Sequence, residues 1–259
     1  MNVVCTRWEL HCRIMRAYKT MLRTIFAKNA RRITSSNAIA SCSNDCTHEK
    51  ATPQQVRELL RHTAQPVAVV TSFMRSNSND HRYHGATLSS FASVAMDPYP
   101  LVSFALRIPS RMAFSLKSAL PSQSSHLVIN LLSSEQSAVA VKFSRPDLYP
   151  EPFLSAPYTL TRDGLPALEG SLGALSCKLV SAGIPLHDLN YVERGRFDGE
   201  DVCDPGNMVV SELFIARVVR VEAVGLGFAN EENPRTLPLL YHRRGYTSCL
   251  PPRNPSQSK

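Results

Sequence analysis

Hydroxyl side chains are concentrated in one otherwise apolar stretch, Thr87-Leu88-Ser89-Ser90-Phe91-Ala92-Ser93. A strand with hydroxyls on both faces cannot bury them cheaply unless each hydroxyl finds a hydrogen-bond partner. Two explanations stay open at this point. Either the strand faces solvent, or a ligand rich in donors and acceptors satisfies the hydroxyls.

Two basic motifs have residue types and a spacing that suit the binding of an anion. In Arg107-Ile-Pro-Ser110-Arg111 a predicted strand passes into a predicted helix, which brings together free N–H groups, a hydroxyl and a guanidinium. That combination suits a phosphate, and a plain N-cap beside a solvated arginine is the alternative. Lys142-Phe143-Ser144-Arg145-Pro146 ends a second predicted helix, where basic residues also complement the helix dipole.

Several enzyme classes are excluded by missing motifs. The chain has no phosphate-binding GxxxxGK[ST], no dinucleotide-binding GxGxxG, no GxSxG and no HExxH. Outside the N-terminal segment the cysteines are widely spaced, at Cys177, Cys203 and Cys249. We therefore predict no metal site and no acid, base or nucleophile among the side chains.

The net charge of +8 is concentrated at the N-terminus. Residues 1–44 hold eight basic residues and one acidic residue, whereas the rest holds 21 basic and 20 acidic residues, which argues against nucleic-acid binding. An Arg-rich, acid-poor amphipathic helix followed by a Ser/Asn-rich stretch is typical of a mitochondrial transit peptide. We predict a presequence over residues 1–45 and a location in the mitochondrial matrix; a basic tail is the alternative. No apolar run reaches the length of a membrane span.

The remaining pattern predicts a mainly β domain over residues 52–250 and a disordered tail at 251–259. Thr52 and Gln55 form a capping box, with Pro53 at the first helical position, which predicts a helix start. Strands are predicted at 66–73, 85–94, 100–107, 127–132, 172–181, 212–224 (both faces buried) and 237–246. Helices are predicted from Ser110 to Ala119 and from Ser133 to Phe143. Connections are predicted at 75–82 (polar loop), 146–166 (Pro-rich) and 188–210 (inserted polar loop). Many strands with few helices favour a β-barrel.

Taken in order, these segments resemble the flavin reductase-like family of the FMN-binding split barrel. The similarity covers about residues 55–247 and is specific in sum. Its segments are 66–71 (PVAVVT), 85–94 (GATLSSFASV), 97–104 (DPYPLVSF), Pro109–Arg111, 127–132 (LVINLL), Lys142–Ser144 and 239–246 (LLYHRRGY).

This resemblance implies a six-stranded antiparallel Greek-key barrel that forms a homodimer and binds FMN, or FAD, near the subunit interface. It also implies that NADH or NADPH reduces the flavin, often for a partner monooxygenase. By the same resemblance, four residues would contact the isoalloxazine and ribityl parts: Thr87, Leu88, Ser89 and Ser90. Four others would lie near the phosphate: Ser110, Arg111, Ser144 and Arg145.

The chain departs from the family pattern in two places. Where the family often carries Gly-Asp-His, this chain has Val209-Val210-Ser211, and His187 is the nearest histidine, expected in a loop. The usual Ser-Arg-Thr is Ser110-Arg111-Met112, which removes one hydroxyl. We therefore predict an FMN-binding flavin reductase-like oxidoreductase that transfers hydride from NAD(P)H to flavin. The alternatives are a non-catalytic FMN-binding protein and a dimeric scaffold that serves a partner oxygenase.

Overall fold

The computed structural model describes residues 45–74, 82–194, 210–222 and 236–249. The predicted presequence up to residue 44, the predicted polar loop at 75–81 and the predicted tail lie outside these residues. Contacts divide the chain into two units, residues 1–54 and 55–259, and the sheets belong to the second unit. No helix in the described ranges has the length and apolar character that a membrane span requires.

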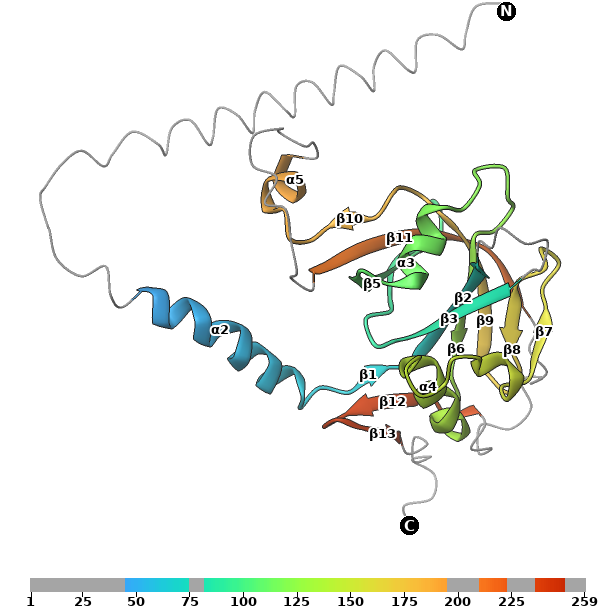
Figure 1. Ribbon diagram of the computed structural model, residues 1–259, viewed down its shortest axis with the longest axis horizontal. Coiled ribbons are helices and arrows are strands. Elements are labelled where there is room, and N and C mark those ends of the chain that lie inside the picture. Colours follow the sequence, from blue (N-terminus) through green and yellow to red (C-terminus); the bar gives the residue numbers. More distant parts are fainter. Residues whose placement is uncertain (1–44, 75–81, 195–209, 223–235, 250–259) are drawn as a thin grey trace, which may run out of the picture. The chain divides into compact units, whose positions relative to one another are not determined.

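The described residues form short helices between many strands (Figure 1). The helices are α2 (Asp45–Leu60), α3 (Arg111–Lys117), α4 (Ser137–Ser144) and α5 (Leu189–Arg194), with 3-10 turns η1 (Ser134–Gln136) and η2 (Pro152–Leu154). The strands are β1 (Gln65–Pro66), β2 (Ala68–Met74), β3 (Arg82–Leu88), β4 (Ala92–Ala95), β5 (Leu101–Ile108), β6 (Leu127–Leu131), β7 (Tyr158–Leu160), β8 (Pro166–Leu168), β9 (Gly173–Leu179), β10 (Ile184–Pro185), β11 (Val210–Glu222), β12 (Leu239–His242) and β13 (Gly245–Ser248).

The main sheet is antiparallel and curls into a half-barrel (Figure 1). It has eight strands in the order β3-β2-β6-β9-β11-β5-β4, with β10 paired to β11. A three-stranded sheet, β1-β12-β13, and the β7–β8 hairpin complete the described strands. The predicted mainly β split-barrel fold is confirmed. The sheet exceeds the predicted six strands because the strand predicted at 85–94 is divided and β10 adds to β11.

The two faces of β2 are buried in different hydrophobic clusters. Ala68 and Val70 pack with Phe104, Phe214 and the α3 side chains, whereas Val69 packs on the other face with α4. A strand covered on both sides needs an apolar residue at nearly every position, which explains the apolar run of 66–70, and the buried hydroxyls of Thr71 and Ser72 that follow donate to carbonyls. The strands predicted at 66–73, 100–107 and 127–132 are confirmed within one or two residues as β2, β5 and β6.

The strand predicted at 85–94 is wrong as a single element, since the chain leaves β3 after Leu88 and resumes as β4 at Ala92. Between them, the Ser90 hydroxyl donates to the Ala105 carbonyl (3.2 Å) and accepts from the Ala105 N–H (3.0 Å). This side chain satisfies backbone groups of β5 that a continuous strand would have paired, and so holds the connection at the corner of the sheet.

The strand predicted at 237–246 is also wrong as a single element, because it forms the β12–β13 hairpin. His242 pairs with Gly245, which leaves Arg243 and Arg244 as a two-residue turn. Both arginines have positive φ, 49° and 66°. Positive φ at both central residues is the conformation of a type I′ hairpin turn. Because Gly and Asn normally supply it, the two arginines gave no sign of the turn.

Smaller differences between the predicted and the observed elements concern where helices and strands begin and which strand faces are buried. The first helix begins at Asp45, so Pro53 lies inside it and Thr52 is not its N-cap. The segment 146–166 contains η2 and β7, and the described start of 188–210 contains α5, none of which was predicted. The 212–224 strand is confirmed as β11, but its predicted burial on both faces is wrong. Val221 is 71% exposed, because no described element covers it.

Candidate functional site

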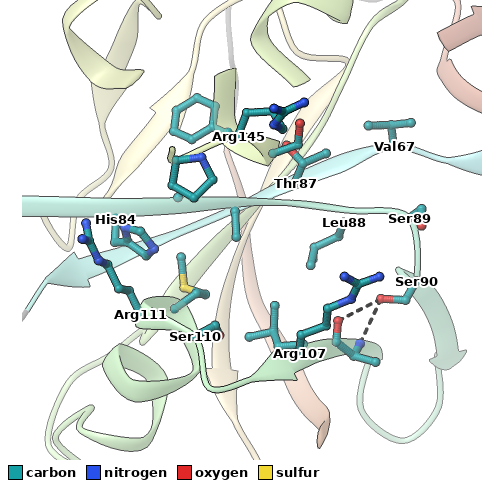
Figure 2. A pocket seen from close by; sticks show the side chains of 18 of the residues that line it. Val67, His84, Thr87, Leu88, Ser89, Ser90, Arg107, Ser110, Arg111 and Arg145 are labelled. Atoms are coloured by element: carbon teal, nitrogen blue, oxygen red, sulfur yellow. Dashed lines mark hydrogen bonds between the residues drawn. The ribbon is translucent and has the colours of Figure 1, made fainter. Parts of the chain in front are cut away.

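A pocket of about 960 Å³ lies where four segments meet. Its walls come from β3 and the connection to β4, from the end of β5 and the start of α3, from the end of α4, and from the β12–β13 hairpin. Figure 2 shows side chains that line it. The volume falls in the range of about 300–1,000 Å³ that is usual for small-molecule and cofactor sites.

All eight site residues predicted from the sequence line this pocket. β3 and its connection contribute four, the start of α3 two and the end of α4 two: Thr87, Leu88, Ser89, Ser90, Ser110, Arg111, Ser144 and Arg145. The fold thus brings the three sequence motifs to one place. Which of these side chains are available to a ligand depends on their present partners.

Most of the hydroxyls are already engaged by the protein. The Thr87 hydroxyl donates to the Ala140 carbonyl of α4 (2.7 Å), and the Ser90 hydroxyl is bonded to the β5 backbone. The Ser144 hydroxyl donates to the Val141 carbonyl (2.9 Å). Ser89 is exposed and makes no hydrogen bond to any described residue. The sequence left open whether these hydroxyls face solvent or a ligand. The structure adds a third role, because the hydroxyls of Thr87 and Ser90 hydrogen-bond to the protein and hold the pocket walls in place.

The start of α3 forms as the sequence predicts. Ser110 adopts an extended conformation, and its hydroxyl accepts a hydrogen bond from the Ala113 N–H (3.2 Å). This confirms the predicted N-cap, which fixes Arg111 at the first position of the helix. The helix has seven residues. Since the Ser110 hydroxyl is used by the cap, Arg111 is the group left to attract an anion.

Three arginines line the pocket, and their surroundings differ. Arg145 is held by Asp147 through two hydrogen bonds of 3.2 Å, and Asp147 is the single acidic residue in the described lining. Arg111 and Arg107 form no ion pair with the described residues. Arg107 stands in the motif that ends the predicted strand at 100–107, but no role was predicted for it.

His84 is a pocket residue that sequence reasoning missed. It lies on β3, is partly buried and stands beside Arg111 in Figure 2. Burial lowers the pKa of its imidazole, and the charge of Arg111 lowers the pKa further. His187 is exposed and does not line the pocket. Only the position of His84 directly before Gly85, in the hydroxyl-rich strand, pointed to it in the sequence.

We expect Arg111→Gln to raise the pKa of His84, because it removes the nearby positive charge. The pKa stays below that of a solvated histidine, since burial is the larger cause of the shift. Titration of the His84 ring protons by NMR in both proteins measures the difference. Arg162→Gln, at an exposed position outside the pocket, is the control. An unchanged His84 pKa in Arg111→Gln would contradict the close approach of these two side chains.

Gly85 sets the shape of the pocket wall beside Phe143. A Cβ atom at position 85 would lie 2.5 Å from two ring carbons of Phe143. Phe143 is buried and packs edge-on against Phe153, with ring centroids 5.0 Å apart. The backbone of β3 therefore approaches an aromatic ring that has little room to move.

A curled antiparallel sheet with a cationic, cofactor-sized pocket at its side defines a cofactor-binding β-barrel protein. The chain belongs to the family of flavin reductase like domains, whose model matches residues 60–249. This confirms the resemblance found in the sequence.

Relatives of the chain are bacterial proteins. An NADPH-flavin oxidoreductase of Streptomyces viridifaciens is 34% identical over 146 residues, which cover 54% of this chain and 69% of that protein. An FMN reductase (NADH) of Agrobacterium fabrum is 30% identical over 130 residues, which cover 47% of this chain and 67% of that protein. The structure of a nitrilotriacetate monooxygenase component B homolog from Mycobacterium thermoresistibile covers 82% of this chain and 94% of its own, with a TM-score of 0.55 and 23% identity. That structure shows the shared fold.

Proposed function

We propose that this protein is a flavin reductase that transfers hydride from NADH or NADPH to a flavin, FMN, bound in the pocket. Membership of the flavin reductase family supports the reaction, and one relative is named an FMN reductase. The observation that carries the site is its described lining, in which guanidinium groups without a carboxylate partner among the described residues lie beside apolar walls, and the one carboxylate of that lining is already paired.

The lining fits the two chemical parts of FMN. Leu88, Leu106 and Met112 are at most 6% exposed and supply apolar surface for a planar ring. Arg111 supplies a fixed positive charge for a phosphate, and charge-assisted hydrogen bonds from arginine are the strong kind. Because Asp147 is bound to Arg145, it adds little repulsion toward an anion.

The flavin and the nicotinamide themselves supply the hydride chemistry. The chain's part is to hold both rings in contact and keep water away from them. The apolar walls exclude water, and the hydrogen bonds of Thr87 and Ser90 keep β3 and the β3–β4 connection fixed against α4 and β5. We assign no side chain to a proton-transfer step.

Anaerobic stopped-flow mixing tests this proposal. When FMN-loaded protein is mixed with NADH or NADPH, the absorption band of the oxidised flavin should disappear as the flavin is reduced. Bound FMN that neither nicotinamide bleaches would instead support a non-catalytic FMN-binding protein. A colourless protein that takes up no added FMN would support the scaffold. A parallel titration with FAD decides which flavin binds more tightly.

We further propose a homodimer that supplies reduced flavin to a partner monooxygenase. Side chains on β4 and the turn after it support an interface there, since Val94, Met96 and Tyr99 are each more than half exposed. β4 also ends the main sheet, so its outer edge is open to pairing. Light scattering of the purified chain measures the assembly directly, and a monomer at micromolar concentration would contradict it.

We also propose import into the mitochondrial matrix, which rests on the charge of residues 1–44. A fusion of residues 1–45 to a fluorescent reporter should reach mitochondria, and the chain without residues 1–45 should stay cytosolic yet still bind flavin. As a control, the presequence with Arg13, Arg16 and Arg23 changed to Gln should lose import. A wild-type fusion that remains cytosolic contradicts the prediction.

A further inference from the structure

The pocket holds two guanidinium groups that no carboxylate among the described residues compensates. Arg145 is compensated by Asp147, but Arg107 and Arg111 are both without a carboxylate partner among the described residues. Arg107 is the last residue but one of β5 and Arg111 begins α3, and both are exposed at the pocket wall.

The two guanidinium groups lie beside different parts of β3. Figure 2 shows Arg111 next to His84, whereas Arg107 points toward Leu88 and the Ser90 corner. His84 and Leu88 are four positions apart, which is about 13 Å along an extended strand. The charge of Arg111 lowers the pKa of His84, which agrees with the placement of these two side chains side by side. This arrangement favours two separate anion positions, one beside each end of this stretch of β3.

The position of Arg107 is fixed by its surroundings. Two residues before it, the backbone of Ala105 is bonded in both directions to the Ser90 hydroxyl. On its other side, β5 pairs with β11, where Arg107 lies opposite Ser211. The backbone of Arg107 therefore lies at a fixed corner of the sheet, and a guanidinium that projects from it can bind a phosphate through two parallel hydrogen bonds.

We propose that Arg107 forms a second anion subsite, which takes a phosphate group of the nicotinamide dinucleotide while Arg111 holds the flavin phosphate. This inference rests on the proposed function, because that reaction brings two phosphate-bearing ligands into one pocket. The phosphate can be the pyrophosphate, which NADH and NADPH share, or the 2′-phosphate, which NADPH alone carries.

The experiment compares three variants of the full chain: Arg107→Gln, Arg111→Gln and the exposed control Arg162→Gln. FMN affinity is measured by fluorescence quenching, and NAD+ and NADP+ are titrated calorimetrically into FMN-loaded protein, so that binding is read without turnover. We expect Arg107→Gln to weaken dinucleotide binding about 10-fold or more and leave FMN within about twofold. Arg111→Gln should weaken FMN binding and leave dinucleotide binding almost unchanged. Arg162→Gln should change neither affinity.

Each outcome decides. Loss of both NAD+ and NADP+ in Arg107→Gln places the pyrophosphate at the subsite, and loss of NADP+ alone places the 2′-phosphate there. Unchanged dinucleotide binding overturns the inference, as does a loss of FMN equal to that in Arg111→Gln. Wild-type protein that binds FMN but neither dinucleotide also overturns it. Wild-type protein that binds both dinucleotides but transfers no hydride overturns the proposed function and leaves the subsite standing.

Discussion

Arg111→Ala should weaken FMN binding about 10- to 100-fold while riboflavin, which lacks the phosphate, binds almost as well as to the wild type. Among the described residues no glycine-rich loop lines the pocket to surround a phosphate, and the Ser110 hydroxyl is occupied by the helix cap. Most of the phosphate's stabilisation must then come from the Arg111 guanidinium. Hydrogen bonds to a charged group contribute about 1.5–3 kcal/mol, which corresponds to that loss.

Titration of both flavins into both proteins by fluorescence quenching measures this contrast. Misfolding would weaken the two ligands alike, so the ratio of their losses isolates the phosphate contact. Arg145→Ala is the matched comparison. We expect a smaller loss of FMN there, because Arg145 must first give up Asp147. Equal losses for FMN and riboflavin, or none, would remove Arg111 from the site.

Gly85→Ala should destabilise the fold by about 1–3 kcal/mol, the range for adding a methyl group to a packed core. The new Cβ would lie 2.5 Å from two ring carbons of Phe143, which is itself buried against Phe153. Either the ring or β3 must move. Because both form the pocket wall, riboflavin binding should fall as well. Denaturation in urea measures the change in the free energy of unfolding.

Gly173→Ala is the control, since a Cβ at that strand position meets no atom within 4 Å. Adding Phe143→Leu to Gly85→Ala should recover part of the lost stability by making room beside the strand. If Gly85→Ala is as stable as Gly173→Ala, the close approach of β3 to Phe143 is not a constraint on this protein.

The sequence by itself determined the elements whose signals are local or continuous. The apolar runs at 66–73 and 127–132 predicted β2 and β6, because a strand buried on both faces must be apolar at nearly every position. Ser110 predicted the start of α3, because an N-cap satisfies the N–H of a residue three positions away. The order of these segments was enough to identify the family, and with it the residues that meet in the pocket.

Tertiary structure alone decided what those residues do. Thr87 hydrogen-bonds to a carbonyl 53 residues away and Ser90 to one 15 residues away, so two hydroxyls that were predicted to contact a ligand also fix the walls. Arg107 and Arg111 line the same pocket, yet no carboxylate among the described residues reaches either of them. His84 enters the site because α3 lies against β3. Hydrogen-bond satisfaction and charge compensation depend on neighbours supplied by other segments, and no local pattern records which neighbours those are.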